Sequence, residues 1–163
     1  MRKPYFLLAL FIFSNAAFAE RNDPMMLWPQ LVQIDWDAYH GKIIESCSIK
    51  FPEYANSFKA DIDKWNGHNT AAIVDIRRQI KTQIKSAKGL SESEITNKVN
   101  LVSKMWTERF IKIIATTSEN EWKETCAGKY ATETLPAMDF ARLLPIVSKE
   151  IPKLKESYIF PEN

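Results

Sequence analysis

The sequence predicts an all-α domain, a compact antiparallel bundle of five to six helices closed by one disulfide. No proline occurs between residues 53 and 135, so long helices can run there without interruption. Apolar residues recur at three- and four-residue steps through most of the chain, as on the buried face of a helix. Alternation of apolar and polar residues between turn dipeptides is absent, so nothing supports β-strands. The expected connections are short, which makes helices that follow one another antiparallel.

The first two helices are expected over residues 35–49 and 52–67. Pro52 suits the first turn of the second helix, because its missing N–H has no partner there in any case. Gly67 can end that helix, since glycine is the usual residue just beyond a helix. The apolar residues that line these helices are Trp36, Ile43, Cys47, Tyr54, Phe58, Ile62 and Trp65.

The third helix is expected to begin at Asn69 or Thr70, both good N-caps, and to end at Gly89. The fourth has the clearest signal, because Ser91 and Glu94 form a capping box. Its apolar residues follow at helical spacing, namely Ile95, Val99, Val102, Trp106, Phe110 and Ile113.

Ser118 and Glu121 repeat the capping box and predict the start of a fifth helix. A sixth should begin near residue 134, with a proline in its first turn. Pro145 and Pro152 are then expected to bend or break the helix that follows.

The N-terminus has the pattern of a secretory signal peptide. Two basic residues precede an apolar run over residues 5–13, far shorter than the roughly 20 residues that span a bilayer. Ala17 and Ala19 supply the small residues of an A-x-A cleavage site. Residues 1–19 are therefore predicted to be removed after Ala19, with export to the periplasm or out of the cell.

Removal of 19 of the 163 residues leaves 144, the size of one domain. We divide residues 20–163 into an irregular lead-in (20–34), a helical body (35–150) and a tail (151–163). None of this is apolar enough for a membrane span. The signal also removes two of the 22 basic residues, which leaves 20 against 20 acidic ones. A neutral chain is not drawn to nucleic acid or anionic membranes, so neither is an expected partner.

Cys47 and Cys126 are the two cysteines of the chain. In an exported domain they most simply form one disulfide, which would join the first and fifth helices.

No catalytic, metal or cofactor motif is present in the sequence. It contains no His-Glu-x-x-His, phosphate-binding glycine loop, EF-hand loop or Gly-x-Ser-x-Gly. His40 lies two helical turns, about 10.5 Å, before Cys47. A nucleophile and its base need about 3 Å, so we read His40 as a packed histidine beside a disulfide. A carboxylate pair assembled from distant helices stays open as an alternative.

The most distinct surface feature is a basic ridge on the third helix. Arg77, Lys81, Lys85 and Lys88 step by four, four and three residues, and Arg78 flanks them. The ridge could dock an acidic protein or an anionic cell-envelope component. Alternatively, it is an ordinary solvated face neutralised by neighbouring acids. Either way, reversal of exposed charges there should hardly change stability.

The tryptophans are a second place to look for a binding residue. Four of the five lie on apolar helix faces, where core packing explains them. Trp28 lies outside the periodic helices and is the candidate for an exposed aromatic anchor in a partner-binding surface.

Three short segments carry a family resemblance: Cys47, Phe51-Pro52-Glu53 and Trp65-Asn66-Gly67-His68-Asn69. Their arrangement resembles that of small secreted all-helical bacterial proteins of unknown function. The resemblance covers residues 36–126 and implies an exported bacterial domain with a signal peptide and one disulfide. It implies no activity.

The leading hypothesis is an exported, non-enzymatic protein that binds another macromolecule, such as an inhibitor or immunity-type protein acting on an envelope toxin or hydrolase. The alternatives are a small-ligand carrier with an apolar cavity between helices and an envelope hydrolase using scattered carboxylates.

Overall fold

The computed structural model describes residues 28–153, apart from the side chains of Trp28, Gln30 and Ala87. This part contains helices and turns and no strand, which confirms the predicted all-α class. The predicted signal peptide, the first part of the lead-in and most of the tail lie outside the described residues.

Four helices of more than ten residues build the described part, so the expected count of five to six is not matched. They are α3 (Trp36–Lys50), α4 (Ala55–Lys88), α5 (Glu92–Ala115) and α7 (Phe140–Glu150). Shorter helical pieces connect them: α2 (Trp28–Leu31), η3 (Pro52–Tyr54), α6 (Glu119–Glu124), η4 (Thr125–Thr134), η5 (Leu135–Met138) and η6 (Ile151–Lys153).

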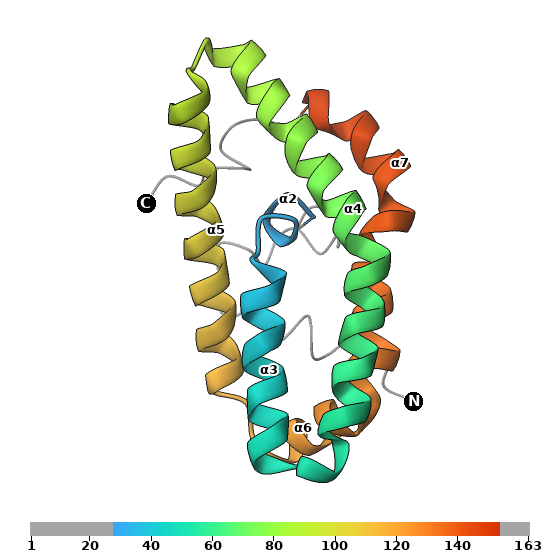
Figure 1. Cartoon of the computed structure of the whole chain (residues 1–163). Coiled ribbons are helices and arrows are strands. Elements are labelled where there is room, and N and C mark those ends of the chain that lie inside the picture. Colours follow the sequence, from blue (N-terminus) through green and yellow to red (C-terminus); the bar gives the residue numbers. More distant parts are fainter. Residues whose placement is uncertain (1–27, 154–163) are drawn as a thin grey trace, which may run out of the picture.

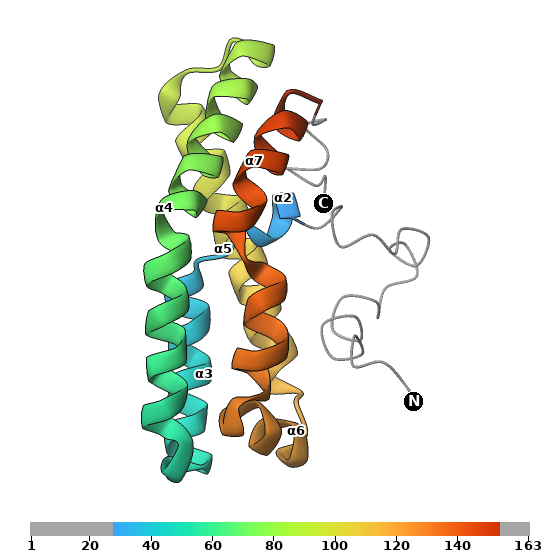
Figure 2. The ribbon, with the colours of Figure 1, turned by 90° about the vertical axis from the view of Figure 1, so that its right-hand side faces the viewer.

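The chain runs up and down the bundle, and successive long helices are antiparallel, as expected (Figure 1). Two helices that are not consecutive, α4 and α7, lie side by side and run in the same direction (Figure 2). The Trp65 indole N–H donates to the Leu135 carbonyl, 3.1 Å away, and further along the Gln83 amide donates to the Pro152 carbonyl. Helix α4 is the central helix of the bundle, since it contacts each of the other three long helices, α3, α5 and α7.

Helix α4 runs without interruption through 34 residues, where the sequence predicted two helices. Gly67 does not end it, and Asn69 is not an N-cap but a buried residue in its interior. The Asn69 amide donates to the Trp65 carbonyl, and its oxygen accepts from the Ala141 N–H of α7. These contacts and the burial of Trp65 outweigh the cost of glycine in a helix, about 1 kcal/mol.

The turn between α4 and α5 forms as predicted. Gly89 has φ 64° and its N–H donates to the Lys85 carbonyl, which ends α4 in the left-handed conformation that glycine adopts without strain. Ser91 then caps α5, and its N–H donates to the Glu94 carboxylate 2.8 Å away. The capping box is confirmed, and the turn residues fix where both helices meet.

The second capping box, at Ser118 and Glu121, is also confirmed and starts α6. The chain continues as η4, which is wound more widely than an α-helix and is kinked at Gly128, where φ is 113°. The predicted Cys47–Cys126 disulfide is present, with 5.6 Å between the Cα atoms, and joins α3 to η4.

The last helix begins later than predicted. The segment near residue 134 forms the short turn η5, and α7 starts after Asp139, whose carboxylate accepts from the Arg142 N–H. Pro145 lies inside α7 and does not break it, whereas Pro152 falls in the turn η6 after its end. The N-cap at Asp139, and not the proline of η5, sets the start of this helix.

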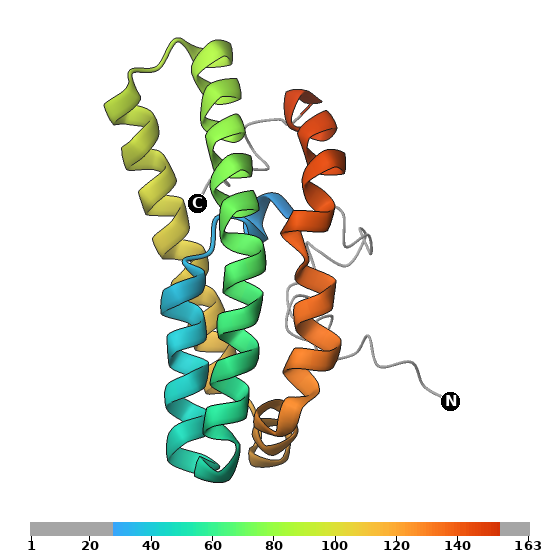
Figure 3. The same cartoon turned by 45° about the vertical axis from the view of Figure 1, so that its right-hand side comes forward.

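Helix α3 fills one position of the bundle over half its length, while α4 and α5 extend well beyond it (Figure 3). Aromatic rings from α3, α4 and α7 pack where all three overlap, with the Trp36 and Trp65 centroids 5.0 Å apart and Phe140 beside both. In the other half, α2 and residues 32–34 take the place of α3 against α4 and α5.

Candidate functional site

The short turn that links α2 to α3 is held by one side chain of α4. The Arg77 guanidinium donates to the Val32 carbonyl at 2.7 Å and to the Ile34 carbonyl at 2.6 Å. Both residues are fully buried, so the chain on either side of Gln33 is fixed. Burial lowers the pKa of Arg77, and the nearby Asp35 and Asp37 oppose that shift.

A groove of about 690 Å³ lies between the C-terminal half of α4 and the N-terminal half of α5. Four basic residues and one acidic residue are among those that line it, which gives the groove a positive lining in a chain that is nearly neutral. The lining residues are Gln33, Val74, Arg77, Arg78, Lys81, Thr82, Lys85, Ser86, Glu92, Val99, Asn100 and Ser103.

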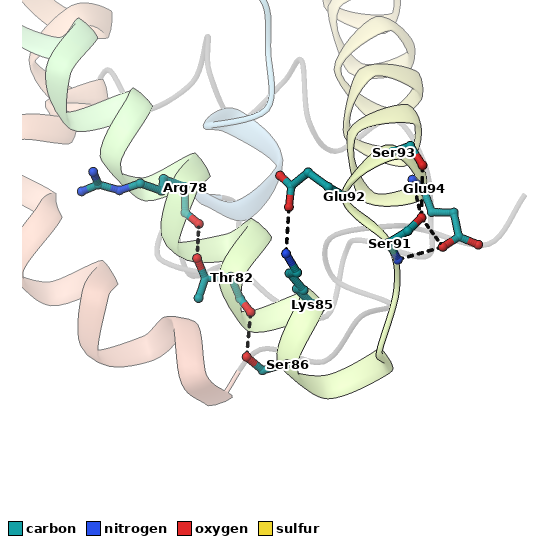
Figure 4. Close-up of polar contacts among 8 residues, drawn as sticks. All are labelled: Arg78, Thr82, Lys85, Ser86, Ser91, Glu92, Ser93 and Glu94. Atoms are coloured by element: carbon teal, nitrogen blue, oxygen red, sulfur yellow. Dashed lines mark hydrogen bonds and ion pairs between the residues drawn. The ribbon is translucent and has the colours of Figure 1, made fainter.

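The structure places the predicted ridge residues in different environments. Arg78 pairs with Asp75, and the Lys85 ammonium lies 3.2 Å from the Glu92 carboxylate across the groove. The Arg78 side chain extends away from that second pair (Figure 4). Lys81 lines the groove and forms no hydrogen bond or ion pair with another described residue. The groove therefore keeps one cation free of acidic partners.

Lys88, the last member of the ridge, is exposed and is not among the residues that line the groove. The side chain of Trp28, the other candidate for partner binding, lies outside the described part of the structure. Only the backbone of Trp28 is placed, at the start of α2. The groove therefore brings together four of the six candidate residues.

The expectation that reversal of ridge charges hardly changes stability assumed exposed side chains, and Arg77 does not meet that assumption, because its guanidinium binds two carbonyls of the link between α2 and α3. Arg77→Met should lower the free energy of unfolding by about 2 kcal/mol, since two carbonyls lose charged donors. Arg78→Met, at an exposed ion pair on the same helix, should change it by less than about 1 kcal/mol. Urea unfolding of both variants measures the difference, and equal effects would contradict the structural role of Arg77.

One histidine, His40, packs in the core, and the other, His68, makes a contact at the start of α7. His40 is buried, and its Nε2 lies 3.1 Å from the Tyr130 hydroxyl. His68 is exposed, with its Nε2 3.1 Å from the Asp139 carboxylate at the start of α7. Because Cys47 is bonded to Cys126, neither histidine has a thiol to activate.

A second, mostly apolar pocket lies between α3, the end of α5 and η4. It offers about 70 Å³ and is lined chiefly by Tyr39, Ile43, Phe110, Ile113 and Trp122. Drug-sized ligands occupy pockets of roughly 300–1,000 Å³. This pocket has room for little more than one small apolar group.

The acidic groups with a shifted pKa lie at helix starts. The pKa of Glu94 and that of Glu121 are both lowered, chiefly by hydrogen bonds from Ser91 and Ser118. A general acid in a hydrolase needs the opposite shift. Within residues 28–153, no three His, Cys, Asp or Glu side chains gather as metal ligands would.

Sequence reasoning identified the basic lining but missed Gln33, which lies in the expected irregular lead-in and belongs to no periodic pattern. The four tryptophans expected in the core, Trp36, Trp65, Trp106 and Trp122, are all buried, as predicted.

No protein family, no curated protein and no solved structure matches this chain.

Proposed function

We propose that this chain is an exported, non-enzymatic binding protein that docks an acidic region of another protein in the groove between α4 and α5. An inhibitor or immunity-type role towards an envelope protein fits this proposal. The observation that carries it is the basic groove itself, a preformed cleft with four basic residues and one acidic residue in its lining.

The charge of the groove contrasts with the charge of the chain. Without residues 1–19 the chain would carry equal numbers of basic and acidic residues. A local excess of positive charge in a neutral protein attracts a negatively charged surface and orients it during encounter. Since the apolar side chain of Val74 also lines the groove, we favour a protein over a purely anionic polymer.

Export is part of the proposal and is supported by two structural features. The Cys47–Cys126 disulfide is typical of oxidising compartments. Among the helices of residues 28–153, none is both long and apolar enough to cross a bilayer. With the signal-like N-terminus, these features favour a periplasmic or secreted protein.

The two alternative functions have less support. A small-ligand carrier would need a larger interior than the apolar pocket beside Tyr39 offers. A hydrolase would need a carboxyl group held protonated in a cleft, whereas the pKa shifts of Glu94 and Glu121 are downward.

The test uses the protein recovered after export, which should begin at Glu20, to capture envelope proteins. A captured partner is then compared with a groove variant, Arg78→Gln, Lys81→Gln and Lys85→Gln. We expect this variant to associate about tenfold or more slowly at low salt, because the lining loses three charges that steer encounter. The difference should largely disappear near 1 M salt, where screening acts within about 3 Å. Association rates are measured by surface plasmon resonance.

The matched control removes three exposed lysines elsewhere on the helices, as Lys50→Gln, Lys64→Gln and Lys112→Gln. It has the same net charge as the groove variant, so it separates a local effect from a global one. Capture alone does not support the proposal. Equal rates for the two triple variants, or no captured partner at all, would overturn it.

A further inference from the structure

An ion pair between α4 and α5 crosses the basic groove. The Glu92 carboxylate at the start of α5 lies 3.2 Å from the Lys85 ammonium of α4, and both residues line the groove (Figure 4). The side chains of Lys85 and Glu92 are 56% and 68% exposed, so a ligand can reach both. Exposed pairs of this kind contribute little to stability. Glu92 therefore neutralises one cation of the groove through a contact that another carboxylate can replace.

The start of α5 does not depend on this contact. Ser91 is the N-cap, and the carboxylate of its capping box comes from Glu94, which accepts from the Ser91 N–H at 2.8 Å. Gly89 ends α4 in the left-handed conformation, so the backbone on both sides of the turn is fixed. Lys85 and Glu92 are thus held opposite each other, and the Glu92 carboxylate can leave Lys85 without loss of the cap.

The cation that a ligand meets first is Lys81. It lies one helical turn before Lys85, about 6 Å along the axis of α4, and also lines the groove. Its side chain is half-buried and forms no hydrogen bond or ion pair with another described residue. Of the other two cations in the lining, Arg77 is bound to backbone carbonyls, and Arg78 pairs with an aspartate of its own helix. A second cation, Lys85, becomes available when Glu92 is displaced.

Displacement of Glu92 favours a ligand with two carboxylates. The first carboxylate binds Lys81 without competition from the protein. A second carboxylate of the same segment then reaches Lys85 in an intramolecular step, at high effective concentration. A spacing of about 6 Å between the two is found for residues two apart in an extended segment and four apart in a helix. A single carboxylate lacks this advantage over Glu92, which is already attached to the protein.

Resting on the function proposed above, we infer that Glu92 is an internal competitor for the acidic partner, and that the groove selects a segment with two carboxylates about 6 Å apart. One carboxylate binds the Lys81 ammonium, and the other replaces Glu92 on the Lys85 ammonium. Glu92 thereby lowers the affinity of the groove for any anion and raises its preference for paired acids.

The first test titrates the exported protein at low salt with a twelve-residue peptide of alanine and serine that carries glutamate at its fourth, sixth and eighth positions. Nuclear magnetic resonance follows the backbone amides of residues 81–86, which should shift on binding. A peptide of the same charge, with glutamate at its first, sixth and twelfth positions, should bind about threefold or more weakly, because its acids lie farther apart. Equal affinities, or no shift with the clustered peptide, would overturn the inference.

The second test is Glu92→Gln, which removes the competing charge and keeps the size of the side chain. The clustered peptide should bind this variant about threefold or more tightly, and the gain should largely disappear near 1 M salt. The matched control is Glu108→Gln, at another exposed glutamate of α5, which lies 3.9 Å from Lys104 and is not among the residues that line the groove. It changes the net charge equally and should leave the affinity unchanged. An equal gain in both variants would contradict a local competition.

A double-mutant cycle separates competition from simple repulsion. Lys81→Gln and Lys85→Gln should each weaken binding of the clustered peptide a few-fold, because each removes one of the two cations. With Lys85→Gln already present, Glu92→Gln should give no further gain, because no ion pair is left to exchange. A gain of the same size in that background would mean that Glu92 merely repels the peptide, and the inference would be wrong.

The inference and the proposed function can fail separately. If a captured partner depends on the basic lining but binds Glu92→Gln with unchanged affinity, the function stands and the competition is wrong. If no partner is captured, the function is wrong, and the peptide titrations still decide whether Glu92 competes.

Discussion

Loss of the Cys47–Cys126 bond should lower the free energy of unfolding by about 4–5 kcal/mol. The two cysteines are 79 residues apart, and a loop of that length strongly restricts the unfolded chain in the loop-entropy model. Domains of ordinary stability have about 5–15 kcal/mol in total. Reduction should therefore remove about a third of that stability or more, with α3 no longer tied to the kinked segment η4.

Urea unfolding of the oxidised protein with and without reductant measures this effect. Titration of thiols in the unfolded, unreduced protein should find essentially none. The variant Cys47→Ala, Cys126→Ala is a second measurement, and it should lose somewhat more than reduction does. Both residues are almost fully buried, so their truncation also leaves a cavity. Two free thiols, or equal stability with and without reductant, would contradict the expectation.

The disulfide also illustrates which features the sequence could predict. Its pairing follows from the number of cysteines, and its place from the apolar faces of two helices. The capping boxes at Ser91 and Ser118 were predictable for a different reason. Each box consists of two residues close together in the sequence, so local chemistry suffices to identify it.

The features that the sequence could not predict depend on distant contacts. Gly67 looked like a helix end, but Asn69 and Trp65 are held by α7 and η5, so α4 continues. Arg77 has the spacing of a surface ridge, yet it donates to carbonyls 43 and 45 residues earlier. Helical periodicity shows which residues lie on the same face of a helix, but it does not show what packs against that face.

The candidate site could be predicted only in part, because periodicity indicates the face on which a residue lies but not what packs against that face. The spacing of Lys81, Lys85 and their neighbours places them on one face of α4, and the structure lines the groove with them. The opposite wall is contributed by α5, and Gln33 comes from the link before α3. Neither could be assigned to the groove until the turn at Gly89 and the contacts of Arg77 had placed these segments beside α4.

The surroundings of His40 make the stability of this protein dependent on pH. The ring packs against both Trp36 and Trp65, and its Nε2 lies 3.1 Å from the hydroxyl of Tyr130. Burial lowers the pKa of His40 to about 4, and Asn66 opposes the shift. An unfolded histidine has a pKa of about 6.5. Between these two values the unfolded chain binds a proton that the folded protein excludes.

We therefore expect the free energy of unfolding to fall by about 3 kcal/mol as the pH drops from about 6.5 to about 4. The sign follows from the direction of the shift, because a depressed histidine pKa in the folded state makes protonation favour unfolding. The lowered pKa values of Glu94 and Glu121 act in the same direction, and their effect begins about one pH unit above their ordinary value of about 4.5. Above about pH 5.5 the change in stability therefore reports on His40.

Urea unfolding at half-unit steps between pH 4.5 and 7.5 measures this slope. His40→Gln keeps an acceptor for the Tyr130 hydroxyl but cannot titrate, so its stability should be nearly constant above about pH 5.5, even if it is lower at neutral pH. The control is His68→Gln, at an exposed histidine beside Asp139, which should retain the full slope. A slope that persists in His40→Gln, or one that disappears in His68→Gln, would show that the acid sensitivity arises elsewhere.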